Sequence, residues 1–223
     1  FLLSSSQEFS TFLEQNSTNL HNYIFQQFIP HGGAVGVYNL VDKGKSIATN
    51  THFRIREYPH SGGPSTLRRS GKHSLCEHFA NKILKSSSWS GVSMVEFRIH
   101  KETKVPYLME INPRFWGSLA LDIHSGVDFP GLVLEHAFPD LVKKACNNRT
   151  NGVISRWLFL GDILWLLTHN NKLKALKTFL NFKDQKFDIL DWKDPLPVIG
   201  SFLEGLLSLT IKSRRQHAFG RGW

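Results

Sequence analysis

Two neighbouring segments in the middle of the chain, residues 94–99 and 108–112, alternate between polar and apolar side chains. Side chains of a strand point alternately to its two faces, so this alternation predicts two half-buried β-strands. The short turn KETK (101–104) between them predicts an antiparallel hairpin. The residues expected on one shared face are Met94, Glu96, Arg98, Leu108, Glu110 and Asn112. In this register Glu96 lies near Glu110.

Two carboxylates side by side on a sheet repel each other, so a positive charge is expected between Glu96 and Glu110. Asn112 adds an amide oxygen, and a ligand set made only of oxygens suits a hard cation such as Mg²⁺. Pro113 ends the strand, and Arg114 follows where it can reach a phosphate that the metal also contacts. Alternating charges are more often the solvated face of a sheet. The ligand chemistry, the proline and the arginine together favour a site for Mg²⁺ and phosphate.

The remaining periodic segments predict a mixture of strands and helices. Strands are expected over residues 23–29, 34–41 and 46–55, the last two joined by a tight turn at DKGK. Capping residues and apolar spacing predict helices over 6–20, 73–84, 118–125 and 130–138. The segment 56–71 is rich in Gly, Pro, Ser and Arg and is typical of a loop. This order predicts an α+β domain over residues 1–140, followed by a mostly helical extension over 141–223.

A basic strand leads into the predicted loop. Arg54 and Arg56 share a strand face with His52, and Gly62 and Gly63 follow shortly afterwards. Guanidinium groups and backbone N–H groups delivered in this way can bind phosphate oxygens. The alternative is a surface loop with solvated arginines. The neighbouring carboxylate hairpin favours the phosphate-binding interpretation.

Other polar residues give weaker signals. Asp122, His124 and Asp128 leave a metal or acid–base role open, although a helical histidine is more often a surface or hydrogen-bonded residue. The 11 histidines show no HExxH spacing, and Cys76 and Cys146 stand far apart with no CxxC pair, so neither a zinc site nor a disulfide framework is expected. No GxSxG, GxGxxG or P-loop pattern occurs.

Composition describes a folded, basic domain. With 27 Lys and Arg against 18 Asp and Glu, the formal net charge is +9, which favours anionic ligands: nucleotides, phosphorylated substrates, nucleic acid or a membrane surface. The basic tail RRQHAFGRGW (214–223) motivates a nucleic-acid-binding hypothesis, but no motif interleaves aromatic and basic residues, so we expect no nucleic-acid partner. The most apolar run, 157–167, is too short for a membrane span and predicts a buried helix. The cysteine usage favours the cytoplasm.

Four segments of the chain, in consistent order, resemble the ATP-grasp superfamily, specifically carbamoyl-phosphate-synthase-like carboxylate–amine ligases. They are YIFQQFIP, RIREYPHSGGPS, GVSMVEFRIH and YLMEINPRFWGSLALDIHSGVDFP, which cover about residues 20–138. The resemblance implies that residues 1–140 form the C-terminal subdomain of an ATP-grasp domain, an antiparallel sheet flanked by helices and incomplete on its N-terminal side. It also implies that residues 141–223 are the helical extension of some members.

The resemblance further implies a mechanism. In the family, ATP and two Mg²⁺ ions bind between two subdomains, a substrate carboxylate attacks the γ-phosphate, and an amine displaces phosphate from the acylphosphate. The metal ligands implied are Glu96, Glu110 and Asn112. The residues implied at the phosphates or substrate are Arg114, Arg98, Arg54, Arg56, Gly62 and Gly63. The residues implied at the adenine are Gln26, Gln27, Phe28 and Ile29. The expected partners are a small-molecule carboxylate and an amine, while Mn²⁺ in place of Mg²⁺ and a homo-oligomer stay open.

Two features depart from the family pattern. The linker that contacts adenine usually carries a glutamate, and here both candidates are glutamines. The family places phosphate-binding lysines upstream of that linker, and residues 1–22 contain neither a lysine nor an initiating Met. These departures predict a fragment of a longer ligase that is inactive in isolation. The alternative is a degenerate ATP-grasp module that binds nucleotide or a partner protein without catalysis.

Overall fold

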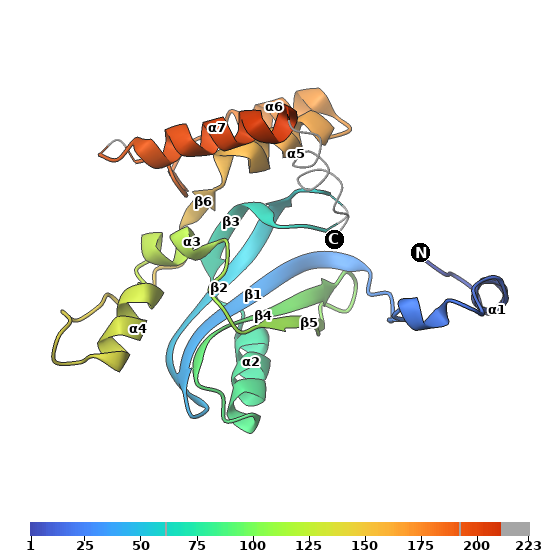
Figure 1. Cartoon of the computed structure of the whole chain (residues 1–223), viewed down its shortest axis with the longest axis horizontal. Helices are drawn as coiled ribbons and strands as arrows, with labels where there is room; N and C mark the ends of the chain where they lie inside the picture. The colour runs from blue at the N-terminus through green and yellow to red at the C-terminus, as the bar shows by residue number, and fades with distance from the viewer. Residues whose placement is uncertain (61, 192, 211–223) are drawn as a thin grey trace.

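A computed structural model describes residues 1–60, 62–191 and 193–210 of the chain (Figure 1). Within this part, seven strands form one sheet in the order β5-β4-β1-β2-β3-β6-β7. The strands are β1 (His31–Asp42), β2 (Lys45–Glu57), β3 (Ser65–Gly71), β4 (Gly91–His100), β5 (Pro106–Asn112), β6 (Ile154–Arg156) and β7 (Gln185–Phe187). Neighbouring strands are antiparallel except β6 and β7, which are parallel. The predicted α+β class is confirmed.

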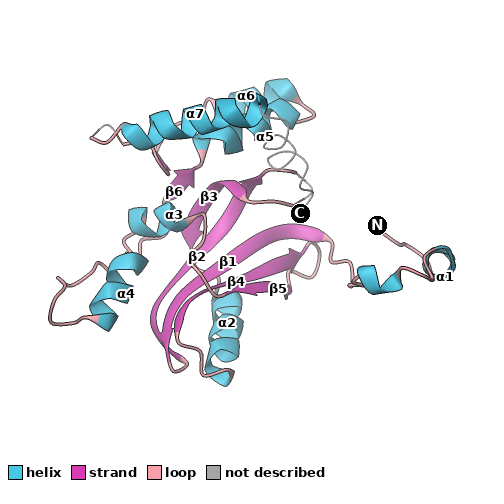
Figure 2. Cartoon of the chain, in the orientation of Figure 1, coloured by secondary structure: helices cyan, strands magenta, loops and turns pink. Residues whose placement is uncertain are grey.

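Helices flank this sheet (Figure 2). They are α1 (Ser6–Gln15), α2 (Ser74–Ser86), α3 (Leu119–His124), α4 (Phe129–Ala137), α5 (Ile163–Thr168), α6 (Lys172–Phe179) and α7 (Leu196–Thr210), with a short 3-10 turn η1 (Leu20–Asn22) and an irregular turn η2 (Leu158–Asp162). In Figure 1, α5, α6 and α7 lie at the β3–β6 end of the sheet, α2 lies at the opposite end of the view, and α1 projects away from the sheet. None of the helices in the described ranges has the length and apolar character that crossing a bilayer requires.

The β1–β2 hairpin forms where the sequence predicts it. Its turn contains Lys43 and Gly44, which have φ values of 47° and 77°. Two successive residues with positive φ produce the tight turn whose twist matches that of the flanking strands. Gly44 adopts this conformation without steric cost, because it carries no Cβ.

Apolar side chains cover both faces of the sheet. On one face, Val95, Phe97 and Ile99 of β4 pack with residues of β1 and α2. On the other face, a second apolar cluster joins the strands to the segment that follows β5 and to α4; its buried members are Tyr38, Leu40, Ala48, Met94, Trp116, Val127, Phe129 and Leu132. The alternation of residues 94–99 therefore reports two buried faces, with Glu96 on the face of the second cluster.

Helix α2 buries a different stripe from the one that its large apolar residues indicate. The spacing of Leu75, Phe79 and Ile83 predicts that stripe, but Leu75 is exposed. The fully buried residues are Cys76, Ala80 and Leu84. The small Cys and Ala side chains let the helix axis approach the sheet closely, while Phe79 packs at the edge of the contact. Burial raises the pKa of the Cys76 thiol to about 12, which agrees with a role in the core.

Two predicted segments differ in the structure. Residues 23–29 form no strand, because no neighbouring strand pairs with them, and they run as an extended connection into β1. Residues 65–71, predicted as loop, form β3 between β2 and β6. The polar composition of β3 concealed it: Arg68 is buried, and its guanidinium forms an ion pair with Asp188 far along the chain.

The C-terminal part is joined to the sheet by strand pairing. Strands β6 and β7 extend the same sheet beyond β3, so the sheet runs across the predicted boundary at residue 140, and the division into two domains stays a prediction. The predicted helix over 157–167 is broken within η2, where Leu160 has a φ of 64°. Trp165 is buried as expected, whereas Trp192 and the basic tail (214–223) lie outside the described residues.

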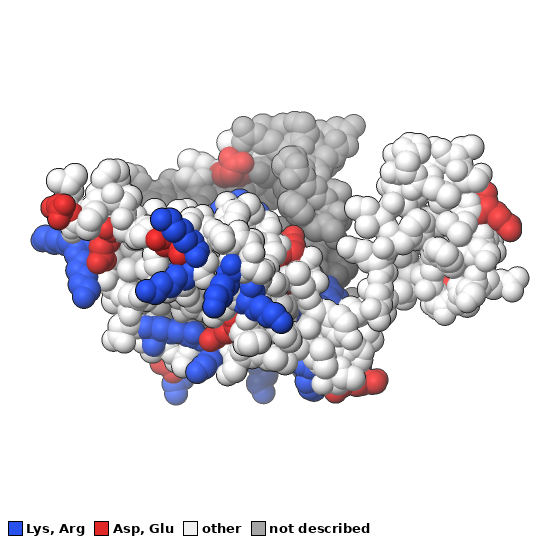
Figure 3. All heavy atoms as spheres, turned by 90° about the horizontal axis from the view of Figure 1, so that it is seen from below, with Lys and Arg blue, Asp and Glu red and all other residues white. Residues whose placement is uncertain are grey.

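The face of the molecule that carries α2 is rich in basic side chains (Figure 3). Seen from below, Lys and Arg side chains predominate over Asp and Glu on this face (Figure 3). Exposed lysines of α2 and its flank include Lys72, Lys82 and Lys85. Since α2 packs on the face of β4 that carries Phe97, much of this charge is separated from Glu96 by the sheet.

Candidate functional site

The carboxylate pair predicted from the hairpin is present. Glu96 of β4 lies directly opposite Glu110 of β5, and Met94 lies opposite Asn112, so the predicted register is confirmed. Asn112 Nδ2 donates a hydrogen bond to Glu110 Oε1 at 2.7 Å. The two carboxylates and the amide therefore follow one another along a single face of the hairpin.

A β-bulge sets the limit of this polar face. The register shifts between Glu96 and Phe97, which leaves Met109 of β5 without a partner. On the turn side of the bulge, Leu108 lies opposite Phe97 and therefore on the face that α2 covers. The expectation that Leu108 shares the face of Glu110 is wrong, because the extra residue reverses the alternation along β5.

The two carboxylates differ in their surroundings. Glu96 is 5% exposed, whereas Glu110 on the edge strand is exposed. The pKa of Glu96 is raised above its ordinary value, mainly by burial, with Glu110 adding to the shift and Arg54 opposing it. A buried carboxylate that has a second carboxylate beside it is a position where a cation stabilises the ionised form.

Arg54 of β2 connects this pair to the glycine-containing loop. Its Nη2 forms an ion pair with Glu96 Oε1, and its Nη1 donates a hydrogen bond to the carbonyl oxygen of Gly63 at 3.0 Å. A Cβ on Gly63 would lie 2.3 Å from the carbonyl oxygen of Tyr58, so this close turn requires glycine. Arg54 thus contacts both the glycine loop predicted from its own segment and Glu96 of the separately predicted hairpin.

The donor chemistry fits a divalent cation of the Mg²⁺ type. Glu96, Glu110 and Asn112 offer only oxygen ligands, and the single positive charge of Arg54 does not balance two carboxylates. The described residues contain no group of three or more His, Cys, Asp or Glu side chains suited to a metal. A cation at this pair would therefore complete its coordination with water or phosphate oxygens, which is the usual state of protein-bound Mg²⁺.

The other predicted arginines lie in different places. Arg98 follows Glu96 on the same face of β4, where it lies opposite Ala34 and Tyr107. Arg114 is exposed just beyond β5, and its Nη1 donates to the carbonyl oxygen of Phe115 at 3.0 Å. In the sequence, Arg98 lies two residues after Glu96 and Arg114 lies two residues after Asn112.

Arg56 is not brought to this pair. It is 8% exposed, its Nη1 lies 2.6 Å from Asp162 Oδ2, and its Nη2 donates to the carbonyl oxygen of Thr178 at 2.7 Å. Its guanidinium also lies over the Trp165 ring. We therefore correct the assignment of Arg56 to the phosphates: the C-terminal extension supplies its partners, and sequence position could not reveal them.

The predicted adenine-contacting residues lie on the connection before β1. Gln26, Gln27 and Phe28 are exposed, and Ile29 is half-buried. This connection meets the β4–β5 hairpin through one backbone hydrogen bond, from Lys101 N–H to the carbonyl oxygen of Pro30 at 3.0 Å. Their role at adenine stays a prediction.

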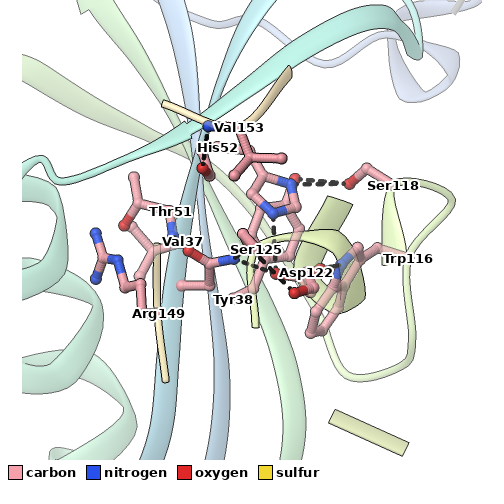
Figure 4. Close-up of polar contacts among 12 residues, drawn as sticks. Val37, Tyr38, Thr51, His52, Trp116, Ser118, Asp122, Ser125, Arg149 and Val153 are labelled. Atoms are coloured by element: carbon pink, nitrogen blue, oxygen red, sulfur yellow. Dashed lines mark hydrogen bonds and ion pairs between the residues drawn. The ribbon is translucent and has the colours of Figure 1, made fainter. Parts of the chain in front are cut away.

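Sequence reasoning missed a buried polar network beside the carboxylate pair (Figure 4). At its centre is Asp122, which is fully buried. Its Oδ2 accepts from Trp116 Nε1 at 2.7 Å, and its Oδ1 accepts from Asn50 Nδ2 at 2.8 Å. His52 Nε2 lies 2.9 Å from the same Oδ1. The available signal was the row of polar residues on one face of β2, Asn50 and His52, without an obvious solvent-exposed role.

The neighbours of Asp122 named from the sequence have local roles. Asp128 Oδ1 accepts from Gly131 N–H at 3.0 Å and so caps the start of α4. His124 Nε2 lies 3.1 Å from the carbonyl oxygen of Phe187. These contacts explain both residues without a metal or acid–base role.

A family model described as "ATP-grasp in the biosynthetic pathway with Ter operon" matches residues 42–158, just over half of the 223-residue chain. The chain belongs to this ATP-grasp family. The matched range contains the whole β4–β5 hairpin as well as Arg54, Arg114 and Asp122. The resemblance to ATP-grasp proteins drawn from the sequence motifs is therefore confirmed.

Solved structures resemble the ATP-grasp fold of this chain at low identity. The biotin carboxylase domain of a thermophilic 2-oxoglutarate carboxylase, bound to bicarbonate, has a TM-score of 0.51 and 13% identity over 67% of this chain and 36% of that chain. The phosphoribosylaminoimidazole carboxylase ATPase subunit from Aquifex aeolicus has a TM-score of 0.43 and 14% identity over 64% of this chain and 50% of that chain. The chain thus spans half or less of the length of these structures. No curated protein matches it.

Proposed function

We propose that this chain carries part of the nucleotide site of an ATP- and Mg²⁺-dependent ligase. The ligase activates a carboxylate as an acylphosphate and transfers the acyl group to an amine or similar nucleophile. The observation that carries the proposal is the direct pairing of Glu96 with Glu110, with Asn112 and Arg54 in contact with the pair, inside the range that matches the ATP-grasp family.

Each residue of the candidate site has a chemical role in this proposal. Glu96, Glu110 and Asn112 would hold Mg²⁺, which when bound neutralises charge on the phosphate oxygens of the nucleotide. Arg54 holds the buried Glu96 carboxylate in place and ties it to the loop at Gly63. Arg114 and Arg98 present guanidinium groups that can bind the oxygens of the transferred phosphoryl group and stabilise their developing charge. Gln26 and its neighbours are proposed to contact adenine.

The reaction balances without a further reactant. A carboxylate oxygen attacks the γ-phosphorus of ATP, the bond between that phosphorus and the bridging oxygen breaks, and ADP leaves. The nitrogen lone pair of the amine then attacks the acyl carbon, and the bond to the phosphate oxygen breaks. Phosphate leaves, and the proton of the amine passes to solvent or a base. Positioning and charge stabilisation supply most of the catalysis in such phosphoryl transfers.

The test is the affinity for Mg-ATP of the Glu110→Ala variant, measured by calorimetry on the protein expressed from its complete reading frame. We expect at least a tenfold loss, because a charged ligand contributes about 1.5–3 kcal/mol. Glu102→Ala, which removes an exposed carboxylate from the turn of the same hairpin, is the matched control and should bind as the parent does. An unchanged affinity in Glu110→Ala would refute the assignment of the metal site.

A module that binds nucleotide or a partner protein without catalysis is the second candidate. The ion pair between Arg54 and Glu96 motivates it, since this contact satisfies part of the carboxylate without a metal. Release of phosphate from ATP, stimulated when a panel of carboxylates and amines is added to the protein from the complete reading frame, distinguishes the two. Nucleotide binding without any stimulated release would favour the inactive module.

A further inference from the structure

A row of residues crosses the sheet at the level of the carboxylate pair. Strand pairing aligns Glu110, Glu96, Gly36 and His52 across β5, β4, β1 and β2. A Cβ on Gly36 would lie 2.5 Å from Tyr38 Oη, so the Tyr38 side chain lies over Gly36, in the gap between Glu96 and His52. The ring of Tyr38 is 4.0 Å from that of His52. Burial, with the charge of Glu96 adding to it, raises the pKa of Tyr38.

From Tyr38 a chain of polar contacts leads to Asp122 (Figure 4). Ser118 Oγ donates to Tyr38 Oη at 3.2 Å and lies 3.2 Å from His52 Nδ1. His52 Nε2 lies 2.9 Å from Asp122 Oδ1, within hydrogen-bond distance. All four side chains are buried, so their contacts are protected from competition with water.

The same chain anchors the segment that carries Arg114. Residues 113–118 form neither helix nor strand, yet two of them are fixed by the network. Trp116 donates to Asp122 at 2.7 Å, and its ring lies 4.4 Å from that of Tyr38. Ser118 contacts Tyr38 and His52 directly. Arg114 therefore stands between the end of β5 at Asn112 and a buried anchor at Trp116.

We propose that Tyr38, His52, Ser118 and Asp122 are positioning residues, which hold the Arg114 segment in register with the Glu96–Glu110 pair. This inference rests on the proposed function of that pair. Packing of Trp116 alone would fix the depth of the segment, whereas the directional hydrogen bonds of Trp116 and Ser118 also fix its rotation. The network acts through Arg114 and touches neither nucleotide nor metal itself.

The test compares two nucleotides in the protein from the complete reading frame. Mg²⁺ with the non-hydrolysable β,γ-imido analogue of ATP presents the phosphoryl group that Arg114 is proposed to bind, and Mg-ADP lacks it. Arg114→Ala should lower the affinity for the analogue about tenfold more than the affinity for Mg-ADP. Ser118→Ala and Tyr38→Phe should also weaken binding of the analogue more than binding of Mg-ADP, by about threefold to tenfold. In the Arg114→Ala background, Ser118→Ala should add no further selective loss, because both changes remove one interaction.

A control separates positioning from general stability. Ser93→Ala also removes a buried hydroxyl, from β4, where Ser93 Oγ has no hydrogen-bond partner among the described residues. It should leave the ratio of the two affinities unchanged. Suppose that Ser118→Ala and Tyr38→Phe lower the affinity for both nucleotides equally, or for neither, while Arg114→Ala still lowers the affinity for the analogue selectively. The positioning role is then refuted and the proposed site stands. If the unmodified protein binds neither nucleotide, the proposed function fails and the inference with it.

Discussion

A buried carboxylate in the C-terminal extension, that of Asp162, forms ion pairs with two arginines of the sheet. Removing the charge of this carboxylate should destabilise the protein by a predictable amount. Asp162 Oδ2 lies 2.6 Å from Arg56 Nη1 and 2.6 Å from Arg156 Nε. Asp162 Oδ1 accepts from Thr66 Oγ1 at 2.9 Å. Asp162 and Arg156 are fully buried. Asp162→Asn keeps the volume of the side chain and removes its charge, so the expected effect is electrostatic rather than a cavity.

The magnitude follows from the loss of one partner in a buried ion pair. Such a loss costs about 3–5 kcal/mol, because the remaining charge stays buried without compensation. Here two guanidinium groups lose their shared carboxylate, which favours the upper half of that range. The rings of Trp165 and Phe179, each 4.3 Å from one of the guanidinium carbons, still contribute about 0.5–2 kcal/mol each and offset part of the loss. We expect a loss of about 3–4 kcal/mol.

The assay is urea unfolding followed by tryptophan fluorescence, with thermal melting as a second readout. For a chain of this size, about 3–4 kcal/mol corresponds to a fall in Tm of roughly 6–16 °C. Asp184→Asn is the matched control: Asp184 is exposed in the same extension and has a φ of 56°, which asparagine tolerates. It should change the unfolding free energy by less than about 0.5 kcal/mol. A loss below about 1 kcal/mol in Asp162→Asn would refute the view that this cluster fastens the extension.

The remaining predictions concern titration and thiol chemistry. Because the pKa of Glu96 is raised, its contribution to stability is present below pH 4.5 and is lost as the pH rises through its folded pKa. Glu96→Gln should therefore make the free energy of unfolding less dependent on pH between pH 4.5 and that folded pKa. The pKa of Glu77 shifts in the opposite direction: burial alone would raise it, but hydrogen bonds from Arg149 and Thr51 hold it below 4.5. The stabilisation by Glu77 is therefore lost as the pH falls through its lowered folded pKa. Glu77→Gln should remove this loss of stability at acid pH. Mass spectrometry after iodoacetamide treatment at neutral pH should find Cys146 modified in the folded protein and Cys76 modified only after unfolding, since Cys146 is exposed and Cys76 is buried with a pKa of about 12; equal labelling of both in the folded protein would contradict the core assignment.

The hairpin and its carboxylate pair could be predicted because the information is local. A period of two places Glu96 and Glu110 on defined faces, and a short turn limits the register to one or two choices. The β-bulge at Met109 was not predictable by the same reasoning, because an inserted residue changes the alternation without changing the composition of the strand. The metal-binding role of these residues, in contrast to their register, stays a prediction.

The sequence by itself determined the elements whose pattern repeats within a few residues: the β1–β2 and β4–β5 hairpins, α2 and the ATP-grasp motifs. Only the tertiary structure decided the fate of the buried polar groups. Arg54 and Arg56 are two residues apart on one strand, yet one binds Glu96 and the other binds Asp162. The physical reason is that a buried charge must find a partner of opposite charge, and this partner comes from wherever the chain returns. The local pattern predicts that the two arginines share a strand face, whereas the register shift between them and the return of the chain decide which carboxylate each one meets.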